Sequence, residues 1–235
     1  MINQVFILAA GQGSRMRPLT DNIPKPLIKV NGRSMLDRIL DKVSTLAQIK
    51  KIVINGFYLA DQLEAHLNSL NNPKIIFSKE TEKLETGGGL LKALPLFDQD
   101  QPILIINGDI VWQETAALNK IIAAFDERNT DILLGIKAKE ELLGYEGNGD
   151  FNFDEKTGEL TRSENNDFVY AGIHIFHPRI LKKQNLPPSP FSLSYFFKDA
   201  AAKGIRLKGI KLVGKFFHIG TENDLKKYQN FVDKQ

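Results

Sequence analysis

Glycines and cationic side chains are concentrated near the start of the chain, directly after an apolar segment. Residues 5–10 (Val-Phe-Ile-Leu-Ala-Ala) lead into Gly11 and Gly13, and Arg15 and Lys25 follow. An apolar segment without alternation is typical of a buried strand in a parallel sheet. A glycine-rich loop after such a strand can bring backbone N–H groups against a phosphate, and Arg15 and Lys25 add positive charge there. The segment therefore predicts a binding site for a polyphosphate.

Two other kinds of phosphate loop do not match this segment. A P-loop requires Gly-Lys-Ser or Gly-Lys-Thr, which the sequence lacks, and the dinucleotide-binding fingerprint requires a third glycine where this chain has Met16. A Gly-x-Gly pair alone is most often a turn. Here the pair is joined to Arg15 and to the segments 18–20 (Pro-Leu-Thr) and 24–26 (Pro-Lys-Pro). This combination favours a phosphate site over a simple turn.

An acidic residue follows a second apolar segment. Residues 103–106 (Ile-Leu-Ile-Ile) run into Asn107, Gly108 and Asp109. Mg²⁺ in proteins prefers a few carboxylates together with substrate phosphates and water, so Asp109 is the leading candidate for a metal ligand. An Asx turn is the alternative interpretation of Asn-Gly-Asp, and the presence of the glycine loop favours the metal.

Two further segments have more than one interpretation. Residues 87–89 are three consecutive glycines, which lose backbone entropy on folding unless the backbone must approach something closely. They indicate either contact with the edge of a base or sugar, or tight packing of a helix on a strand. His218 is a candidate second metal ligand, a sugar contact or a satisfied half-buried histidine. We assign no role to the other histidines, His66, His174 and His177.

Strands and helices alternate along the first two-thirds of the chain and would position these residues. We expect strands at 5–10, 51–54, 75–77, 103–106, 132–136 and 169–176, and helices at 34–47, 59–70, 88–94, 114–127, 194–203 and 221–232. This order implies right-handed crossovers and a largely parallel sheet, with ligands beyond the carboxyl ends of the strands. The glycine loop and Asp109 both lie at such ends.

Residues 143–167 differ from the rest of the chain. They are rich in Gly, Asn, Asp and Glu and contain turn signals. We expect an excursion with a small β-hairpin inside a single domain that spans residues 1–235.

Two helix starts and one helix end have recognisable local signals. Ser34 with Asp37, and Thr221 with Asp224, are predicted N-terminal cap pairs. Gly204 is predicted to end the helix that precedes it.

The composition is that of an ordinary globular protein. The 235 residues are 42% hydrophobic and 25% charged, which suits one α/β domain. The sequence has no cysteine, which excludes disulfides and thiolate ligands and favours a cytoplasmic protein. A net charge of +3 without a long basic run predicts no nucleic-acid partner. The apolar segments are shorter than the ~20 residues of a membrane span, and the N-terminus lacks a basic leader, so no membrane partner is expected.

Several of the segments above form a longer motif. Residues 8–20 read Leu-Ala-Ala-Gly-x-Gly-x-Arg-Met-x-Pro-Leu-Thr, and further matching pieces lie at 84–89, 107–112, 147–151 and 219–221. Together with 24–26 they resemble the signature of the sugar-phosphate nucleotidyltransferase family, nearly end to end. The resemblance implies a three-layer α/β/α Rossmann-like fold with a mostly parallel mixed sheet. It also implies a short form without the left-handed β-helix domain of many relatives.

The resemblance implies roles for individual residues. It assigns the nucleoside triphosphate to Ala9, Ala10, Gly11, Gly13, Ser14, Arg15, Lys25, Glu80 and Asn107. It assigns the sugar 1-phosphate to Glu85, Asp150 and Gly172, and the metal to Asp109 and His218. Arg15, Lys25 and Asp109 are the implied catalytic residues.

The chain departs from the family pattern at two places. Relatives usually have Asp where this chain has His218, and imidazole suits Mg²⁺ less well than carboxylate does. The implied cofactor is Mg²⁺, held by Asp109 and phosphates, with Mn²⁺ as the alternative. The Glu-Lys-Pro motif that holds the sugar phosphate in many relatives is missing, and Lys156 and Arg162 are the candidate substitutes.

The implied reaction is in-line attack of a sugar 1-phosphate on the α-phosphorus of a nucleoside triphosphate. UTP and N-acetylmuramic acid 1-phosphate are the favoured substrates, with a role in bacterial peptidoglycan recycling. The alternatives are guanylyl or cytidylyl transfer to another sugar or alcohol phosphate, such as mannose 1-phosphate. Two further alternatives are a nucleotide-sugar-dependent glycosyltransferase and a non-catalytic nucleotide-binding subunit. We expect a monomer or a homodimer.

Overall fold

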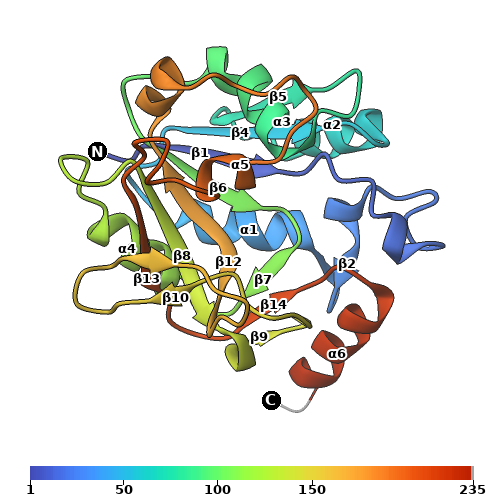
Figure 1. The fold of residues 1–235 in the computed structure, drawn as a ribbon. Helices are drawn as coiled ribbons and strands as arrows, with labels where there is room; N and C mark the ends of the chain where they lie inside the picture. The colour runs from blue at the N-terminus through green and yellow to red at the C-terminus, as the bar shows by residue number, and fades with distance from the viewer. Residues whose placement is uncertain (234–235) are drawn as a thin grey trace.

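The centre of the protein is a seven-stranded mixed sheet (Figure 1). A computed structural model describes residues 1–233, so the last two residues of the predicted 1–235 domain lie outside the described residues. The strand order is β13-β8-β12-β6-β1-β4-β5. These strands are β1 Gln4–Leu8, β4 Lys51–Gly56, β5 Ile75–Lys79, β6 Ile103–Asn107, β8 Ile132–Ala138, β12 Phe168–Phe176 and β13 Leu207–Lys211.

Most neighbouring strands in this sheet are parallel. Strand β12 runs antiparallel to both of its neighbours, β6 and β8, and the other neighbouring pairs run parallel. The predicted mostly parallel mixed sheet is confirmed.

Helices cover both faces of the sheet, which gives three layers (Figure 1). One face packs against α1 Met35–Ser44, α2 Ala60–Ser69 and α4 Ala116–Ala124, and the other against α3 Glu85–Ala93 and α5 Ser194–Phe197. Val5 and Ile7 of β1 belong to the first core and Phe6 to the second, because successive side chains of a strand point to opposite faces. The fully apolar segment is therefore a strand buried on both sides, as its sequence predicts.

Shorter strands form three small sheets beside the large one. They are β7 Ile110–Trp112 with β14 Phe216–His218 and β9 Leu142–Leu143, β2 Lys29–Val30 with β3 Arg33–Ser34, and β10 Asn152–Phe153 with β11 Leu160–Thr161. The last pair is a hairpin within residues 143–167, as expected. Strand β14 pairs antiparallel with β7, with His218 opposite Ile110. This pairing brings the C-terminal segment to the residue that follows Asp109.

Both predicted N-terminal cap pairs are confirmed, but in one of them the acidic side chain has a different partner. Thr221 and Asp224 form a reciprocal capping box at α6 Glu222–Val232. Ser34 Oγ accepts a hydrogen bond from the Asp37 N–H at 2.9 Å. The Asp37 carboxylate contacts His66 Nε2 at 2.8 Å. This partner of His66 could not be predicted from the sequence, since the two residues belong to different helices.

The predicted helix 194–203 is wrong beyond its first turn. Helix α5 ends at Phe197, since Lys198 is extended and Asp199 adopts a left-handed conformation with φ 54°. An α-helix cannot continue through such a residue. Helix α3 begins at Glu85, three residues before the predicted start of the 88–94 helix.

Candidate active site

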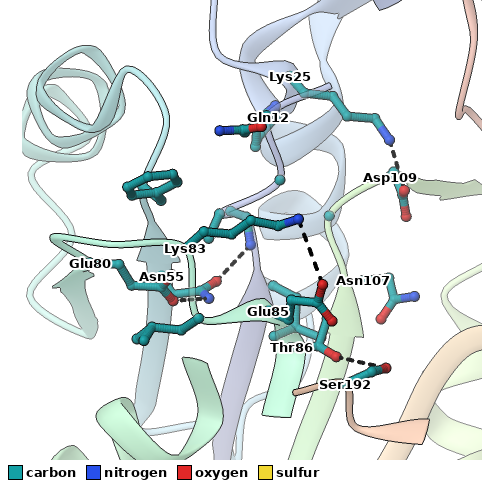
Figure 2. A pocket seen from close by; sticks show the side chains of 18 residues that line it. Gln12, Lys25, Asn55, Glu80, Lys83, Glu85, Thr86, Asn107, Asp109 and Ser192 are labelled. Atoms are coloured by element: carbon teal, nitrogen blue, oxygen red, sulfur yellow. Dashed lines mark hydrogen bonds and ion pairs between the residues drawn. The ribbon is translucent and has the colours of Figure 1, made fainter. Parts of the chain in front are cut away.

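A cavity of about 310 Å³ opens where β1, β4, β5 and β6 end (Figure 2). Its wall includes Leu8 and Asn107, the last residues of β1 and β6, together with Gly11, Lys25 and Asp109. The structure thus brings the glycine loop and the acid after β6 to the same edge of the sheet. The proximity of these two segments is the main spatial prediction from the sequence.

The glycine loop is a tight turn closed by its own side chains. Gly13 has φ +65°, and a Cβ atom at this position would lie 2.7 Å from Thr20 Cγ2. Thr20 Oγ1 and the Met16 N–H both donate to the Gly13 carbonyl oxygen, each at 2.8 Å. Glycine is required here because both the left-handed backbone and the lack of space exclude a side chain. The turn leaves Gly11 and Gln12 exposed at the cavity.

Lys25, Asp109 and His218 form a cluster at the edge of the cavity, and the first two belong to its wall. Lys25 Nζ donates to Asp109 Oδ2 at 2.8 Å, and His218 Nε2 lies 3.4 Å from the same oxygen. Burial raises the pKa of Asp109, but the charge of Lys25 and the hydrogen bond and charge of His218 outweigh it, so the pKa falls well below its usual range. Asp109 is therefore a carboxylate at neutral pH, suited to a cation.

Arg15 lies beside this cluster. It belongs to the short 3₁₀ helix Ser14–Met16 and is exposed. A Cβ atom at Gly220 would lie 3.1 Å from Arg15 Nη2 and 2.9 Å from His218 Cε1. The guanidinium group therefore lies against the segment that follows β14. Among the described residues, Gly13, Ser14 and Arg15 are not part of the cavity wall.

A buried polar pair forms the opposite wall of the cavity (Figure 2). Asn55 Nδ2 donates to Glu80 Oε1 at 2.7 Å, and Asn55 Oδ1 accepts from the Ala9 N–H at 2.7 Å. Burial raises the pKa of Glu80, which the hydrogen bond from Asn55 only partly offsets. Ala10 also lines the cavity. The Ala9 N–H is thus used inside the protein, while Ala10 and Glu80 face the space predicted for the base.

The three glycines of α3 are packing positions. A Cβ atom would lie 2.3 Å from a Phe191 ring carbon at Gly87, 2.6 Å from Ser189 Oγ at Gly88, and 2.8 Å from Glu80 Oε1 at Gly89. All three glycines are buried. Of the two interpretations of this run, the structure supports tight packing.

The residues just before these glycines do line the cavity. Glu85 and Thr86 belong to the wall, and the Glu85 carboxylate lies 3.6 Å from Lys83 Nζ. Helix α3 therefore presents its first turn, and not its glycines, to a ligand.

A second cavity of about 260 Å³ adjoins the first. The two share Leu8, Thr86, Asn107 and Ser192 as a common wall. The second one is also lined by Asp150, whose Oδ2 accepts the Tyr170 N–H at 2.9 Å. The predicted sugar residue Asp150 thus lies in a cavity next to the one at the glycine loop.

Gly172 of β12, which was also predicted to meet the sugar, is buried. It has φ +78°, and a Cβ atom there would lie 2.2 Å from Ile110 Cγ1 and 3.3 Å from Asn107 Cβ. This glycine allows β12 to pass close to Asn107.

The two candidates for the missing sugar-phosphate motif are separated, since Arg162 lines the second cavity and Lys156 lies in a different groove beside β13.

A tyrosine–histidine pair in the second cavity was not predicted. Tyr170 Oη lies 2.6 Å from His174 Nδ1 and 3.5 Å from Asn107 Oδ1. Burial lowers the pKa of His174 to about 3 and raises that of Tyr170, so both are neutral at pH 7. A register shift between Tyr170 and His174 brings these side chains together. Gly172 between them was the available signal.

Asp109 and His218 are the two residues that could contact a metal ion. Among residues 1–233, no group of three or more acidic or histidine side chains is arranged to hold one. One carboxylate supplemented by substrate phosphates and water is a common arrangement for Mg²⁺. The donor set therefore fits a cation that arrives with a nucleotide.

No helix among the described residues has the length and apolar character needed to cross a membrane.

Comparison with known proteins connects this geometry to a family. The N-acetylmuramate alpha-1-phosphate uridylyltransferase of Caulobacter vibrioides is 37% identical to this chain, over 92% of the chain and 90% of its own length. The protein of the same name from Neisseria meningitidis is 31% identical over 96% of both chains. The inositol-1-phosphate CTP transferase of T. maritima has a similar fold, with a TM-score of 0.81 at 18% identity over 97% of this chain and 94% of its own. Nucleotidyl transferase is the family description that matches residues 4–235, and the chain belongs to that family.

Proposed function

We propose that the protein transfers the uridylyl group of UTP to N-acetylmuramic acid α-1-phosphate and releases pyrophosphate. Two full-length relatives with this activity in their names support the choice of substrates. The observation on which the proposal depends is the cluster of Lys25 and Asp109 at the glycine loop, next to a second cavity. The proposal includes a cytoplasmic protein, a role in bacterial peptidoglycan recycling, and a monomer or homodimer without nucleic-acid or membrane partners.

Each cavity has a proposed ligand. The larger one takes the nucleotide, with its base against Ala9, Ala10 and Glu80 and its phosphates against Gly11 and Lys25. The phosphates extend past this wall to Gly13, Ser14 and Arg15 of the glycine loop. The smaller one takes the sugar, against Asp150 and the β12 segment around Gly172, with Glu85 at the entrance from the nucleotide side. Asn107 lies in the shared wall, where the two substrates must meet for phosphorus to be attacked.

The reaction depends on neutralisation of phosphate charge and on the positions of the substrates more than on a general base of the protein. The attacking phosphate has a second pKa of about 6 and is largely dianionic at pH 7. It can therefore attack the α-phosphorus while pyrophosphate leaves on the opposite side. Lys25 and Arg15 neutralise charge that develops on the transferring and leaving phosphates.

Asp109 is the residue that would hold a divalent cation, with His218 beside it. When bound, such a cation would neutralise phosphate charge and orient the triphosphate. Lys25 already contacts Asp109 at 2.8 Å, so the lysine would share or release this carboxylate when the nucleotide binds. We propose Mg²⁺ as the cation, with Mn²⁺ as the alternative.

A matrix of four nucleoside triphosphates and several sugar 1-phosphates, each with Mg²⁺ and with Mn²⁺, tests the proposal. We expect pyrophosphate release to be fastest with UTP and N-acetylmuramic acid 1-phosphate. Faster reaction with GTP or CTP, for example with mannose 1-phosphate, would support guanylyl or cytidylyl transfer. Release of nucleoside diphosphate from a nucleotide sugar would indicate a glycosyltransferase. Binding of UTP in calorimetry without turnover under either metal would indicate a non-catalytic subunit.

A further inference from the structure

We infer that Arg162 is a specificity-determining residue of the sugar-side cavity, which binds the carboxylate of an acidic sugar substrate. This inference rests on the proposed function, because it concerns the sugar that occupies the second cavity. It gives Arg162 a role different from the one expected from the sequence, where it was a candidate for holding the sugar phosphate.

Arg162 is the cation of this cavity. The described residues that line it include one acidic side chain, Asp150, and one arginine, Arg162. His174 is neutral at pH 7, because burial lowers its pKa to about 3. The lysines among the described residues of the neighbouring cavity are already paired, Lys25 with Asp109 at 2.8 Å and Lys83 with Glu85 at 3.6 Å. An anionic group of the sugar that enters this space can therefore pair with Arg162.

The guanidinium group of the exposed Arg162 lies against an aromatic ring. Its Cζ lies 4.5 Å from the centre of the ring of Phe151, which is buried and lies within the excursion of residues 143–167. Stacking on a ring leaves the N–H groups at the guanidinium edge available for a planar, bidentate partner such as a carboxylate. Within residues 1–233, Arg162 forms no ion pair with an acidic side chain.

The charges around the cavity explain why an acidic sugar would need this arginine. Asp150 lines the cavity, and Glu85 lies at the adjoining nucleotide side. A third carboxylate brought into this space would be repelled and partly desolvated unless it is paired. The phosphate of the same sugar must reach the shared wall at Asn107 to attack the nucleotide. Arg162 can therefore serve a second anionic group of the sugar.

The test compares two sugar 1-phosphates that differ by the lactyl carboxylate. Pyrophosphate release is measured with N-acetylmuramic acid 1-phosphate and with N-acetylglucosamine 1-phosphate for the wild type, Arg162→Gln and Arg162→Lys. We expect Arg162→Gln to raise KM for the muramyl substrate by about 10- to 100-fold, as for loss of a charge-assisted hydrogen-bond pair. KM for the glucosamine substrate should change by less than about threefold, and Arg162→Lys should fall between, because lysine lacks the planar fork.

Lys156→Gln provides the matched control. Lys156 is an exposed cation in the turn of the same β10–β11 hairpin, but it lines a different groove. Its substitution removes the same charge and should leave both KM values unchanged. Turnover of the glucosamine substrate by Arg162→Gln reports that this variant is folded.

Two results would overturn the inference. An equal rise of KM for both sugars would mean that Arg162 contacts a group common to them, such as the phosphate. Unchanged KM for both would mean that it contacts neither. If the wild type released no pyrophosphate with any pair of substrates, the proposed function would fail. Calorimetry of the same two sugar phosphates with a non-hydrolysable UTP analogue would then still decide the inference, because preferential loss of the muramyl ligand in Arg162→Gln requires no turnover.

Discussion

At the scale of single residues, two neighbouring arginines of the glycine loop have different surroundings. Arg15 lies beside His218 and Gly220, whereas the exposed Arg17 pairs with Asp21 at 3.3 Å. We expect Arg15→Ala to lower kcat by about 10²-fold or more, because it removes a donor aimed at charge that develops on the phosphates. Arg17→Ala is the control and should behave like the wild type in steady-state kinetics. A purified Arg15→Ala enzyme with near-normal kcat would remove Arg15 from the mechanism.

His218 occupies the position at which a second carboxylate would suit Mg²⁺ better. Its Nε2 lies 3.4 Å from Asp109 Oδ2. We expect His218→Asp to lower the Mg²⁺ concentration for half-maximal activity by about tenfold, in line with changes of metal-site residues. Titration of activity with Mg²⁺ measures this change. Parallel titration with Mn²⁺ is the internal control and should change less, because Mn²⁺ tolerates an imidazole ligand better. An unchanged Mg²⁺ titration would place His218 outside the metal site.

At the scale of elements, α3 depends on its glycines to pack against the segment around Phe191. A Cβ atom at Gly87 would lie 2.3 Å from the Phe191 ring and 2.8 Å from the Phe191 carbonyl oxygen. We expect Gly87→Ala to lower the free energy of unfolding by about 1–3 kcal/mol, the usual cost of overpacking. Lys92→Ala, at an exposed position of the same helix, should change it by less than about 0.5 kcal/mol. Urea denaturation of the two variants measures the difference, and equal stabilities would argue against the packing role.

The sequence predicts elements well where one local rule decides the structure. The apolar strands β1 and β6, the amphipathic helix α1 and the capping box of α6 follow directly from their residues. Strand β13 was not predicted, because its segment Leu-Lys-Gly-Ile-Lys has little apolar character and is fixed by pairing with β8. Helix α5 was predicted too long, because its end depends on the left-handed Asp199 and on no glycine or proline.

The candidate site also has parts that the local sequence predicts and parts that it does not. The glycine loop and Asp109 follow strands whose carboxyl ends must meet in a parallel sheet, so their proximity is predictable. The contact between Tyr170 and His174 depends on a register shift in β12, and the second cavity depends on how the excursion folds back over the sheet. Such tertiary details have no local signal in the sequence.

At the scale of the whole molecule, a buried carboxylate just before the start of β8 connects this strand to segments that are distant in the sequence. Asp131 accepts hydrogen bonds from Arg179 at 2.7 Å and from Arg206 at 2.8 Å. Burial raises the pKa of Asp131, but the hydrogen bonds of Arg206 and Arg179 outweigh it and hold this pKa well below its usual range. A carboxyl group with a lowered folded-state pKa contributes stability that is fully present above its unfolded pKa. This stability is lost as the pH falls below about 4.

We therefore expect Asp131→Asn to lower the free energy of unfolding by about 2 kcal/mol at pH 7, because it breaks a charge-assisted cluster with partly exposed arginines. The difference from the wild type should shrink as the pH falls to 3, because the carboxyl group of Asp131 takes up a proton in the unfolded chain at this pH while it stays ionised in the folded protein. Urea denaturation at both pH values measures it. Asp100→Asn, in an exposed ion pair with Lys182 at 3.6 Å, is the control and should have little effect. A difference that does not depend on pH would show that the charge of Asp131 is unimportant.

The pairing of β14 with β7 has a consequence for how the protein is made. Asp109 and His218 become neighbours when a strand near the end of the polypeptide docks beside one from its middle. A ribosome must therefore have synthesised the chain through His218 before this cluster can assemble. Prematurely terminated products that stop before β14 would contain the complete glycine loop but would lack His218 and the strand that places it beside Asp109.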